Sequence, residues 1–270
     1  MGTTTQPAAA PLVIEERAGA VTIIRLNRLE KLNALNQQLG QDLVHALLRA
    51  QGDKDVRCVV LTGSGRAFCA GGDLEMLRDA RQRKAVSEVE DLVTAGKEIS
   101  IAIATMPKIV IASVNGVAAG GGMNLALAAD IRIASDQARF AESFAQIGLF
   151  PDFGGTYFLP RIVGPTRAAE LFYTGQMLSA DDALRLGIVS RVVPADQLEA
   201  ETKKLAESIA TGAGLAQRDV KHRMNSEHRK ELEDALDEEI RLQRHCFESH
   251  DFLEGLNAFF EKRKPNFEGH

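Results

Sequence analysis

Residues 108–122 read KIVIASVNGVAAGGG, an apolar run that breaks at Asn115-Gly116 and is followed by a glycine triplet. The first seven residues are rich in β-branched side chains, which predicts a strand of a parallel sheet that is buried on both faces. A short buried helix is expected after Gly122. Consecutive glycines cost backbone entropy, so a triplet in a stable protein indicates that the chain uses it.

The pattern of a short apolar strand followed by a helical stretch recurs on both sides of this segment. We expect a hairpin over residues 12–26, a helix over 33–51, strands over 56–62, 130–134 and 138–140, a loop over 63–72 and a helical stretch over 73–106. Farther on, we expect a capping box at 179–182, a brief strand over 188–193 and helices from 194 onward. This alternation of strands and helices predicts an α/β fold.

The composition narrows the class of protein. The chain has 270 residues, a net charge of −5 and three cysteines. The acidic balance disfavours a nucleic-acid partner, and three cysteines cannot form a disulfide framework, so a reducing, cytoplasmic location is expected. We expect a disordered tail over 1–11, a core over 12–193 and a helical region over 194–270. Residues 109–129 have no charge, but their glycines and asparagines argue against a membrane span.

Several kinds of active site are disfavoured because their motifs are missing. The six histidines show no metal-binding spacing, so no metal is expected, and neither a nucleophile elbow nor a phosphate-binding loop is present. Residues 116–122 follow a strand and open a helix, but their spacing departs from the dinucleotide-binding pattern. Cys69 is a possible nucleophile without a nearby histidine in the sequence, and a small packed residue is the favoured interpretation.

Two glycine clusters remain to be explained, Gly71-Gly72 and Gly120-Gly121-Gly122, each lying between a predicted strand and a predicted helix. Helix N-termini offer unpaired backbone N–H groups, and glycine lets a ligand atom approach them closely. Two such turns on neighbouring strands can direct two N–H groups at one point, which is the construction of an oxyanion hole. The alternative is that both clusters are tight turns without a ligand, and spacing alone leaves the two possibilities open.

Several separated motifs, in order, resemble the enoyl-CoA hydratase/isomerase (crotonase) superfamily over residues 12–267. They are Asn27-Arg28 with Leu32–Leu35, Arg66–Leu74 (RAFCAGGDL), Ser113–Gly122 (SVNGVAAGGG), Gly148–Thr156 (GLFPDFGGT), Thr174-Gly175 to Gly187, and Phe260–Pro265. The resemblance implies a spiral of ββα units with a helical C-terminal region that forms trimers, often paired into hexamers. It also implies an acyl-CoA thioester substrate whose carbonyl oxygen is held by the N–H groups of Gly72 and Gly121.

The sequence departs from the hydratase members at both positions where these carry a catalytic glutamate, since it has Asn124 and Phe144 there. The resemblance instead points to Asp152, because isomerase-type members, including 1,2-epoxyphenylacetyl-CoA and dienoyl-CoA isomerases, use an aspartate at this position. One carboxylate suffices to move a proton between two carbons, and burial near Phe144 is expected to raise its pKa. The plain alternative for Asp152 is a helix N-cap. Glu142 is the reserve base, with a surface or salt-bridge role as its alternative.

For the CoA half of the substrate, the resemblance implies contacts with Ala70, Asp73 and Leu74, mostly through backbone groups. Phe259 and Lys262 are expected to reach a neighbouring subunit's ligand, with Lys262 near the phosphates. No cofactor is expected, because coenzyme A is part of the substrate. The favoured function is therefore an acyl-CoA isomerase. The alternatives are an unusual enoyl-CoA hydratase and a non-catalytic scaffold that binds CoA or RNA.

Overall fold

The computed structural model describes residues 10–226 and 228–270, so most of the predicted tail over 1–11 lies outside the described residues. The main sheet has the strand order β1-β2-β3-β5-β7-β10. Its strands are β1 (Val13–Ala18), β2 (Val21–Leu26), β3 (Cys58–Gly63), β5 (Ile109–Val114), β7 (Ile131–Ser135) and β10 (Arg191–Val193). The β1–β2 hairpin is antiparallel and the other pairs are parallel, as the buried apolar runs predict.

A second, smaller sheet has the order β4-β6-β8-β9. It consists of β4 (Ala67–Cys69), β6 (Val117–Ala119), β8 (Arg139–Ala141) and β9 (Leu178–Ser179). Each of β3, β5 and β7 is thus followed by a short strand in the second sheet, which confirms the expected ββα units. The prediction of a loop over 63–72 was wrong, because β4 lies within it. A strand of three residues is too short to show a period in the sequence.

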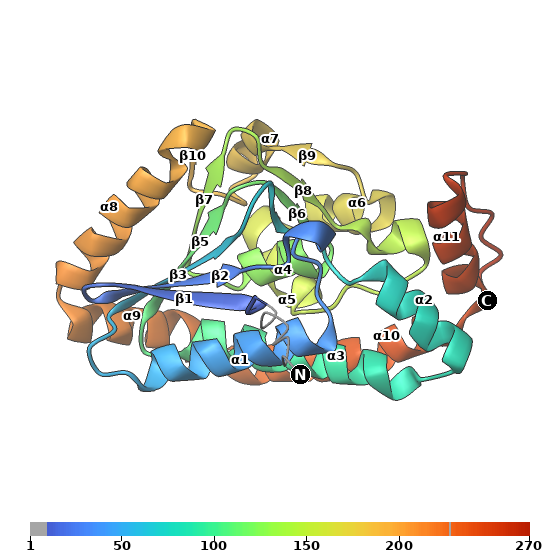
Figure 1. The fold of residues 1–270 in the computed structure, drawn as a ribbon, viewed down its shortest axis with the longest axis horizontal. Helices are drawn as coiled ribbons and strands as arrows, with labels where there is room; N and C mark the ends of the chain where they lie inside the picture. The colour runs from blue at the N-terminus through green and yellow to red at the C-terminus, as the bar shows by residue number, and fades with distance from the viewer. Residues whose placement is uncertain (1–9, 227) are drawn as a thin grey trace, which may run out of the picture.

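The helices before residue 128 are α1 (Gln37–Gly52), α2 (Leu74–Arg83), α3 (Val86–Thr105) and α4 (Gly121–Leu127). The helical stretch predicted over 73–106 is confirmed, and it consists of two helices because Lys84 adopts a left-handed conformation and ends α2. Helix α1 covers one face of the main sheet, where Leu39, Leu43 and Leu47 are fully buried, and α8 (Leu198–Thr211) packs on the other face (Figure 1). The main sheet is therefore buried on both faces.

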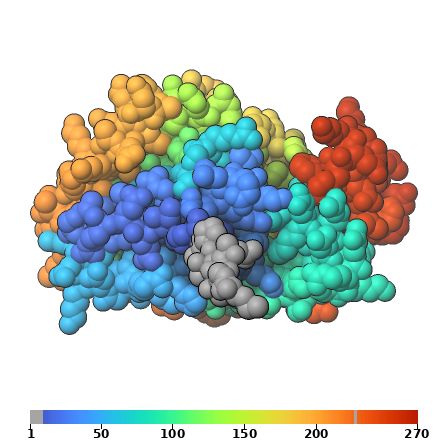
Figure 2. Space-filling model, in the orientation of Figure 1, coloured from blue at the N-terminus to red at the C-terminus, as the bar shows by residue number. Residues whose placement is uncertain are grey.

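The remaining helices are α5 (Gly155–Val163), α6 (Pro165–Thr174), α7 (Ala180–Arg185), α9 (Gly214–Ser226), α10 (Arg229–Glu248) and α11 (His250–Glu261). The expected capping box at Ser179 and Asp182 begins α7. Leu232 and Leu236 of α10 pack on α3 and α5 of the same chain. Figure 2 shows α11 at one end of the molecule (Figure 2). Within the described residues, no helix is both long and apolar enough to cross a membrane.

A buried ion pair joins α9 to the residue that directly precedes β7 of the main sheet. Lys221, which is 4% exposed, donates hydrogen bonds to Asp130 Oδ2 at 2.7 Å and to the carbonyl oxygens of Ile103 and Lys108. Asp130 Oδ2 also accepts the Val110 N–H at 2.8 Å. Removing one member of such a pair leaves the other charge buried without its partner.

We therefore expect Lys221→Met to lower the free energy of unfolding by about 3–5 kcal/mol, measured by urea denaturation. The matched control is Lys230→Met, because Lys230 is exposed and pairs with Asp234 one turn away. That control is expected to unfold at the same urea concentration as the wild type. A Lys221→Met protein that unfolds at the same urea concentration as the control contradicts the prediction.

Candidate active site

The two glycine turns lie side by side because the short strands that lead into them are neighbours. Strands β4 and β6 pair in parallel, so their carboxyl ends meet at one edge of the second sheet. A Cβ atom on Gly71 would lie 2.8 Å from the carbonyl oxygen of Ala119, and one on Gly122 would lie 2.1 Å from that of Cys69. Any side chain at either position therefore collides with the backbone of the other turn.

The backbone N–H groups of Gly72 and Gly121 are available at this edge. Gly121 is the first residue of α4, so its N–H has no acceptor within the helix. Among the described residues, the Gly72 N–H donates no hydrogen bond to another residue. Both glycines line the same cavity. This arrangement matches the oxyanion hole that the sequence predicts, and the binding of an oxygen there stays a prediction.

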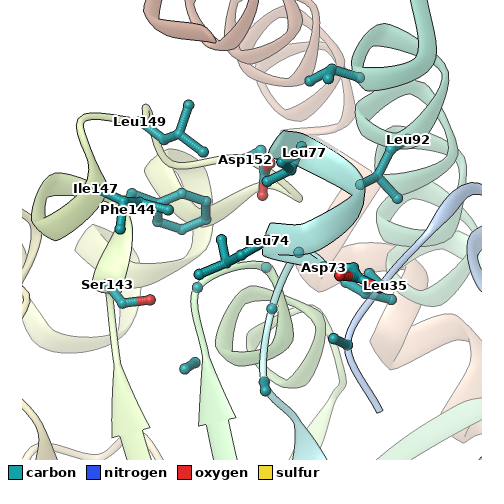
Figure 3. Close-up of a pocket in the computed structure, with 18 of the residues that line it drawn as sticks. Leu35, Asp73, Leu74, Leu77, Leu92, Ser143, Phe144, Ile147, Leu149 and Asp152 are labelled. Atoms are coloured by element: carbon teal, nitrogen blue, oxygen red, sulfur yellow. The ribbon is translucent and has the colours of Figure 1, made fainter. Parts of the chain in front are cut away.

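The cavity has a volume of about 400 Å³ and an apolar wall. Phe144, Ile147 and Leu149 face Leu74 and Leu77 of α2 across it, and Asp152 lies between the two sides (Figure 3). The volume falls within the usual range for small-molecule sites, and a few polar groups in an apolar wall are typical of them. The predicted residues Gly72, Gly121, Asp152 and Phe144 thus come together in one place.

Three carboxylate side chains line this cavity, and two of them are already paired. Asp73 caps α2 by accepting the N–H groups of Glu75 and Met76, and its Oδ2 lies 2.7 Å from the Arg28 guanidinium. Glu75 pairs with Lys31 at 2.6 Å. Asp152 is buried, and its Oδ1 has no hydrogen-bond partner among the described residues. Of the three carboxylates, Asp152 alone is buried and pairs with no cation among the described residues.

Asp152 does not serve as the helix cap that the plain alternative assigned to it. The N-cap of α5 is Gly154, which has no side chain to accept a hydrogen bond. Asp152 Oδ1 instead lies 3.2 Å from the position that a Cβ on Gly121 would take. Burial raises the pKa of Asp152 to about 7, against the opposing effect of a hydrogen bond from Gln243. This carboxyl group therefore changes its protonation state near neutral pH.

Helix α10 holds the loop that carries Asp152. Gln243 Nε2 donates to Asp152 Oδ2 at 3.0 Å, and its Oε1 accepts the Phe150 N–H at 3.0 Å. One turn earlier, Glu239 accepts the N–H groups of Gly154 at 2.8 Å and Thr156 at 3.1 Å. Glu239 thus supplies the N-terminal cap that Gly154 cannot. Sequence analysis assigned no role to either residue. The only signal in the sequence was that Gln243 is a polar residue among apolar residues that recur at helical spacing, namely Leu232, Leu236, Ile240 and Phe247.

Asn124 and Glu142 are buried, and they are not among the residues that line the cavity. Asn124 Nδ2 donates to the backbone oxygen of Asp152 at 2.8 Å, so it braces the Asp152 loop. Glu142 is 1% exposed, and neither of its oxygens has a hydrogen-bond partner among the described residues. The surface or salt-bridge interpretation of Glu142 was therefore wrong. Burial, and then the neighbouring Asp152, raises the pKa of Glu142 well above its usual value.

Of the residues expected to contact CoA, the structure places three at the cavity and Lys262 away from it. Ala70, Asp73 and Leu74 line the cavity near its glycine turns. Lys262 does not line it and instead ends α11 in a left-handed conformation. Phe259 and Phe260 of α11 do line the cavity of their own chain. Lys31 is the cation at the cavity wall, and the sequence analysis missed it because no motif marks an isolated lysine.

The cysteine and histidine side chains of the described residues do not line this cavity. Burial raises the pKa of Cys69 to about 12, so its thiol stays protonated near neutral pH and the packed interpretation is favoured. The structure brings His250, Glu268 and His270 together at the surface, where the two imidazole rings stack with centroids 5.4 Å apart. None of these three residues lines the cavity.

Comparison with known proteins gives a consistent result. The family model for enoyl-CoA hydratase/isomerase matches residues 16–270. A crotonyl-CoA hydratase of Syntrophomonas wolfei is 36% identical over 94% of this chain and 97% of its own length. A 1,2-epoxyphenylacetyl-CoA isomerase of Escherichia coli is 39% identical over 92% and 95%. The crystal structure of an enoyl-CoA hydratase from Mycobacterium avium subsp. paratuberculosis has a TM-score of 0.84, with 31% identity over 94% of this chain and all of that one.

Proposed function

This chain belongs to the enoyl-CoA hydratase/isomerase family, and from that premise we propose that it is an acyl-CoA isomerase. The reaction shifts a double bond, or rearranges a ring, next to a CoA thioester. Asp152 moves the proton, and the N–H groups of Gly72 and Gly121 hold the thioester oxygen. Coenzyme A enters as part of the substrate, so no separate cofactor is required.

The observation that carries this proposal is that one carboxylate of the cavity, that of Asp152, is buried and pairs with no cation among the described residues. Asp152 Oδ1 has no hydrogen-bond partner among the described residues and lies beside Gly121, one of the two proposed oxyanion donors. Phe144 and the buried Asn124 stand where the resemblance implies the two water-binding glutamates of hydratases. One carboxylate in an apolar cavity suits proton transfer between carbons better than the activation of water.

The proposed reaction moves one proton and one electron pair at a time. Asp152 Oδ1 takes a proton from the saturated carbon between the thioester carbonyl and the double bond of a 3-enoyl-CoA, and the electrons of that C–H bond pass into the carbonyl group. Negative charge develops on the thioester oxygen, where each N–H donor is worth about 3–4 kcal/mol. The enolate then recovers the proton from Asp152 at a different carbon. The carboxylate is regenerated, and the double bond has moved.

Enoyl-CoA hydratase is the second candidate, because relatives such as the Syntrophomonas wolfei protein bear that name. In that case Asp152 acts on a water molecule instead of a carbon-bound proton. We also propose that the protein is cytoplasmic and forms a homotrimer or a dimer of trimers. The half-exposed Phe259 on α11, at the edge of the cavity, supports an additional subunit there.

The test of the proposal is product identification with three thioesters, namely crotonyl-CoA, a 3-enoyl-CoA and an epoxidised aryl-acetyl-CoA. We expect an isomerised product from at least one of the last two, and little hydration of crotonyl-CoA. A base must be ionised to act, so kcat/KM is expected to fall as the pH drops below about 7. Rapid hydration of crotonyl-CoA without isomerisation of either other thioester overturns the proposal in favour of the hydratase.

A further inference from the structure

We propose that Gln243 is a positioning residue that decides which oxygen of Asp152 carries the exchangeable proton, and that this oxygen is Oδ1. The catalytic consequence rests on the isomerase function proposed above. The position of the proton itself is a property of the free protein. It can therefore be tested without any turnover.

The first step is the orientation of the Gln243 amide. Its oxygen accepts the backbone N–H of Phe150, a group that can only donate. The amide nitrogen is therefore left to face Asp152 Oδ2, which lies 3.0 Å away. A flipped amide would set two donors against each other at Phe150, and Gln243 is 3% exposed. The two ends of Gln243 are thus fixed by their partners.

The second step concerns the two oxygens of Asp152. Because the Gln243 amide nitrogen donates to Oδ2, that oxygen acts as an acceptor and cannot also direct a proton at the donor. A proton on Asp152 therefore resides on Oδ1. This oxygen has no partner among the described residues and lies beside Gly121. The acidic proton thus faces the point where the thioester is expected to bind.

The third step is that the loop holds the carboxyl group in one place relative to Gln243. The loop around Asp152 is bonded to α10 at Phe150 through Gln243 and at Gly154 through Glu239. From the opposite side, Asn124 holds the backbone oxygen of Asp152 at 2.8 Å. Three buried side chains from two helices therefore fix the backbone on both sides of the carboxyl group.

Two other buried carboxyl groups lie near Asp152. They belong to Glu239 of α10 and to Glu142, which directly follows β8. Glu239 raises the pKa of Asp152, and Asp152 in turn raises the pKa of Glu142. The hydrogen bond from Gln243 opposes the effect of Glu239, because it favours the ionised form of Asp152. Loss of this donor is therefore expected to make Asp152 harder to ionise.

The experiment is a 13C NMR titration of the aspartate carboxyl carbons, with Asp152→Asn identifying the signal of Asp152. In the wild type we expect a midpoint near 7. In Gln243→Met we expect the midpoint to rise by about one to two pH units, the effect of losing a hydrogen bond to a charged group. Gln243→Leu has a similar size and has no donor in any protonation state, and we expect a rise of the same size. A wild-type midpoint in either variant overturns the inference.

The matched control is Gln146→Met, because Gln146 lines the same cavity but donates to the Gly175 carbonyl oxygen and makes no bond to Asp152. Its Asp152 midpoint is expected to equal that of the wild type. If the isomerase proposal is right, the acid limb of kcat/KM in Gln243→Met moves upward with the NMR midpoint, and kcat falls more than KM changes. A shifted NMR midpoint with no isomerisation in any variant supports the inference and overturns the proposed function instead.

Discussion

Asp152→Asn is expected to lower isomerase kcat by at least about 10²-fold, the lower end of the contribution of a positioned acid or base. The amide keeps the size of the side chain and can still accept the hydrogen bond from Gln243. It cannot take a proton from carbon near neutral pH. The loss should therefore fall on kcat, with KM for the CoA thioester changed much less. The measurement is steady-state kinetics on the best substrate of the panel.

Stability separates a chemical loss from a loss of fold in this variant. Burial raises the pKa of Asp152 above its unfolded value, so its ionised form destabilises the folded protein at pH 8, above both values. Asp152→Asn removes that charge and should unfold at an equal or higher temperature than the wild type at pH 8. The difference should shrink as the pH falls toward 5, because Asp152 then becomes protonated in the folded wild type.

The control for this substitution is Asp196→Asn, the same chemical change at an exposed residue that does not line the cavity. It is expected to have wild-type kcat and KM. If Asp152→Asn retains more than a tenth of the wild-type kcat while folded, Asp152 is not the proton carrier. Glu142 then becomes the next base to test, since it is a buried carboxyl group close enough to Asp152 for the two to raise the energy of each other's charge.

The glycine turns could be located from the sequence because a turn after a buried strand is a local feature. An apolar run, a break at Asn115-Gly116 and a glycine triplet follow each other within fifteen residues. The short strands β4 and β6, whose parallel pairing brings Gly72 and Gly121 to one cavity, were not predicted, because each has only three residues. The resemblance to the family pointed to Asp152, and its burial was expected from the neighbouring phenylalanines.

The hydrogen bonds that hold Asp152 and its loop in place could not be predicted, because they come from residues about ninety positions away in the sequence. Gln243 and Glu239 lie on a helix whose partner surface no local pattern reveals. Glu142 was misjudged for the same reason, since a glutamate is usually solvated and only the tertiary structure buries it. Local patterns therefore located the two glycine turns and the resemblance pointed to Asp152, whereas the groups that hold Asp152 in place became visible only in the folded chain.

Gly122→Ala is expected to have the second large effect, because it acts on the spacing of the two glycine turns. A Cβ on Gly122 would lie 2.1 Å from the carbonyl oxygen of Cys69, whereas carbon and oxygen atoms normally stay about 3.3 Å apart. Both partners are backbone, so β4 and α4 must separate by about 1 Å. Gly72 follows Cys69 closely, and Gly121 adjoins Gly122. The two N–H groups therefore move apart.

A displacement of this size between catalytic groups costs about 10²-fold in rate, and loss of one oxyanion donor costs about 10²- to 10³-fold. We therefore expect Gly122→Ala to lower kcat by at least about 10²-fold and the free energy of unfolding by about 1–3 kcal/mol. Gly52→Ala is the matched control, because a Cβ there meets nothing within 4 Å, and it should keep wild-type activity. A Gly122→Ala protein with wild-type kcat shows that the spacing of the two turns does not govern the reaction, and the proposed oxyanion hole is then in the wrong place.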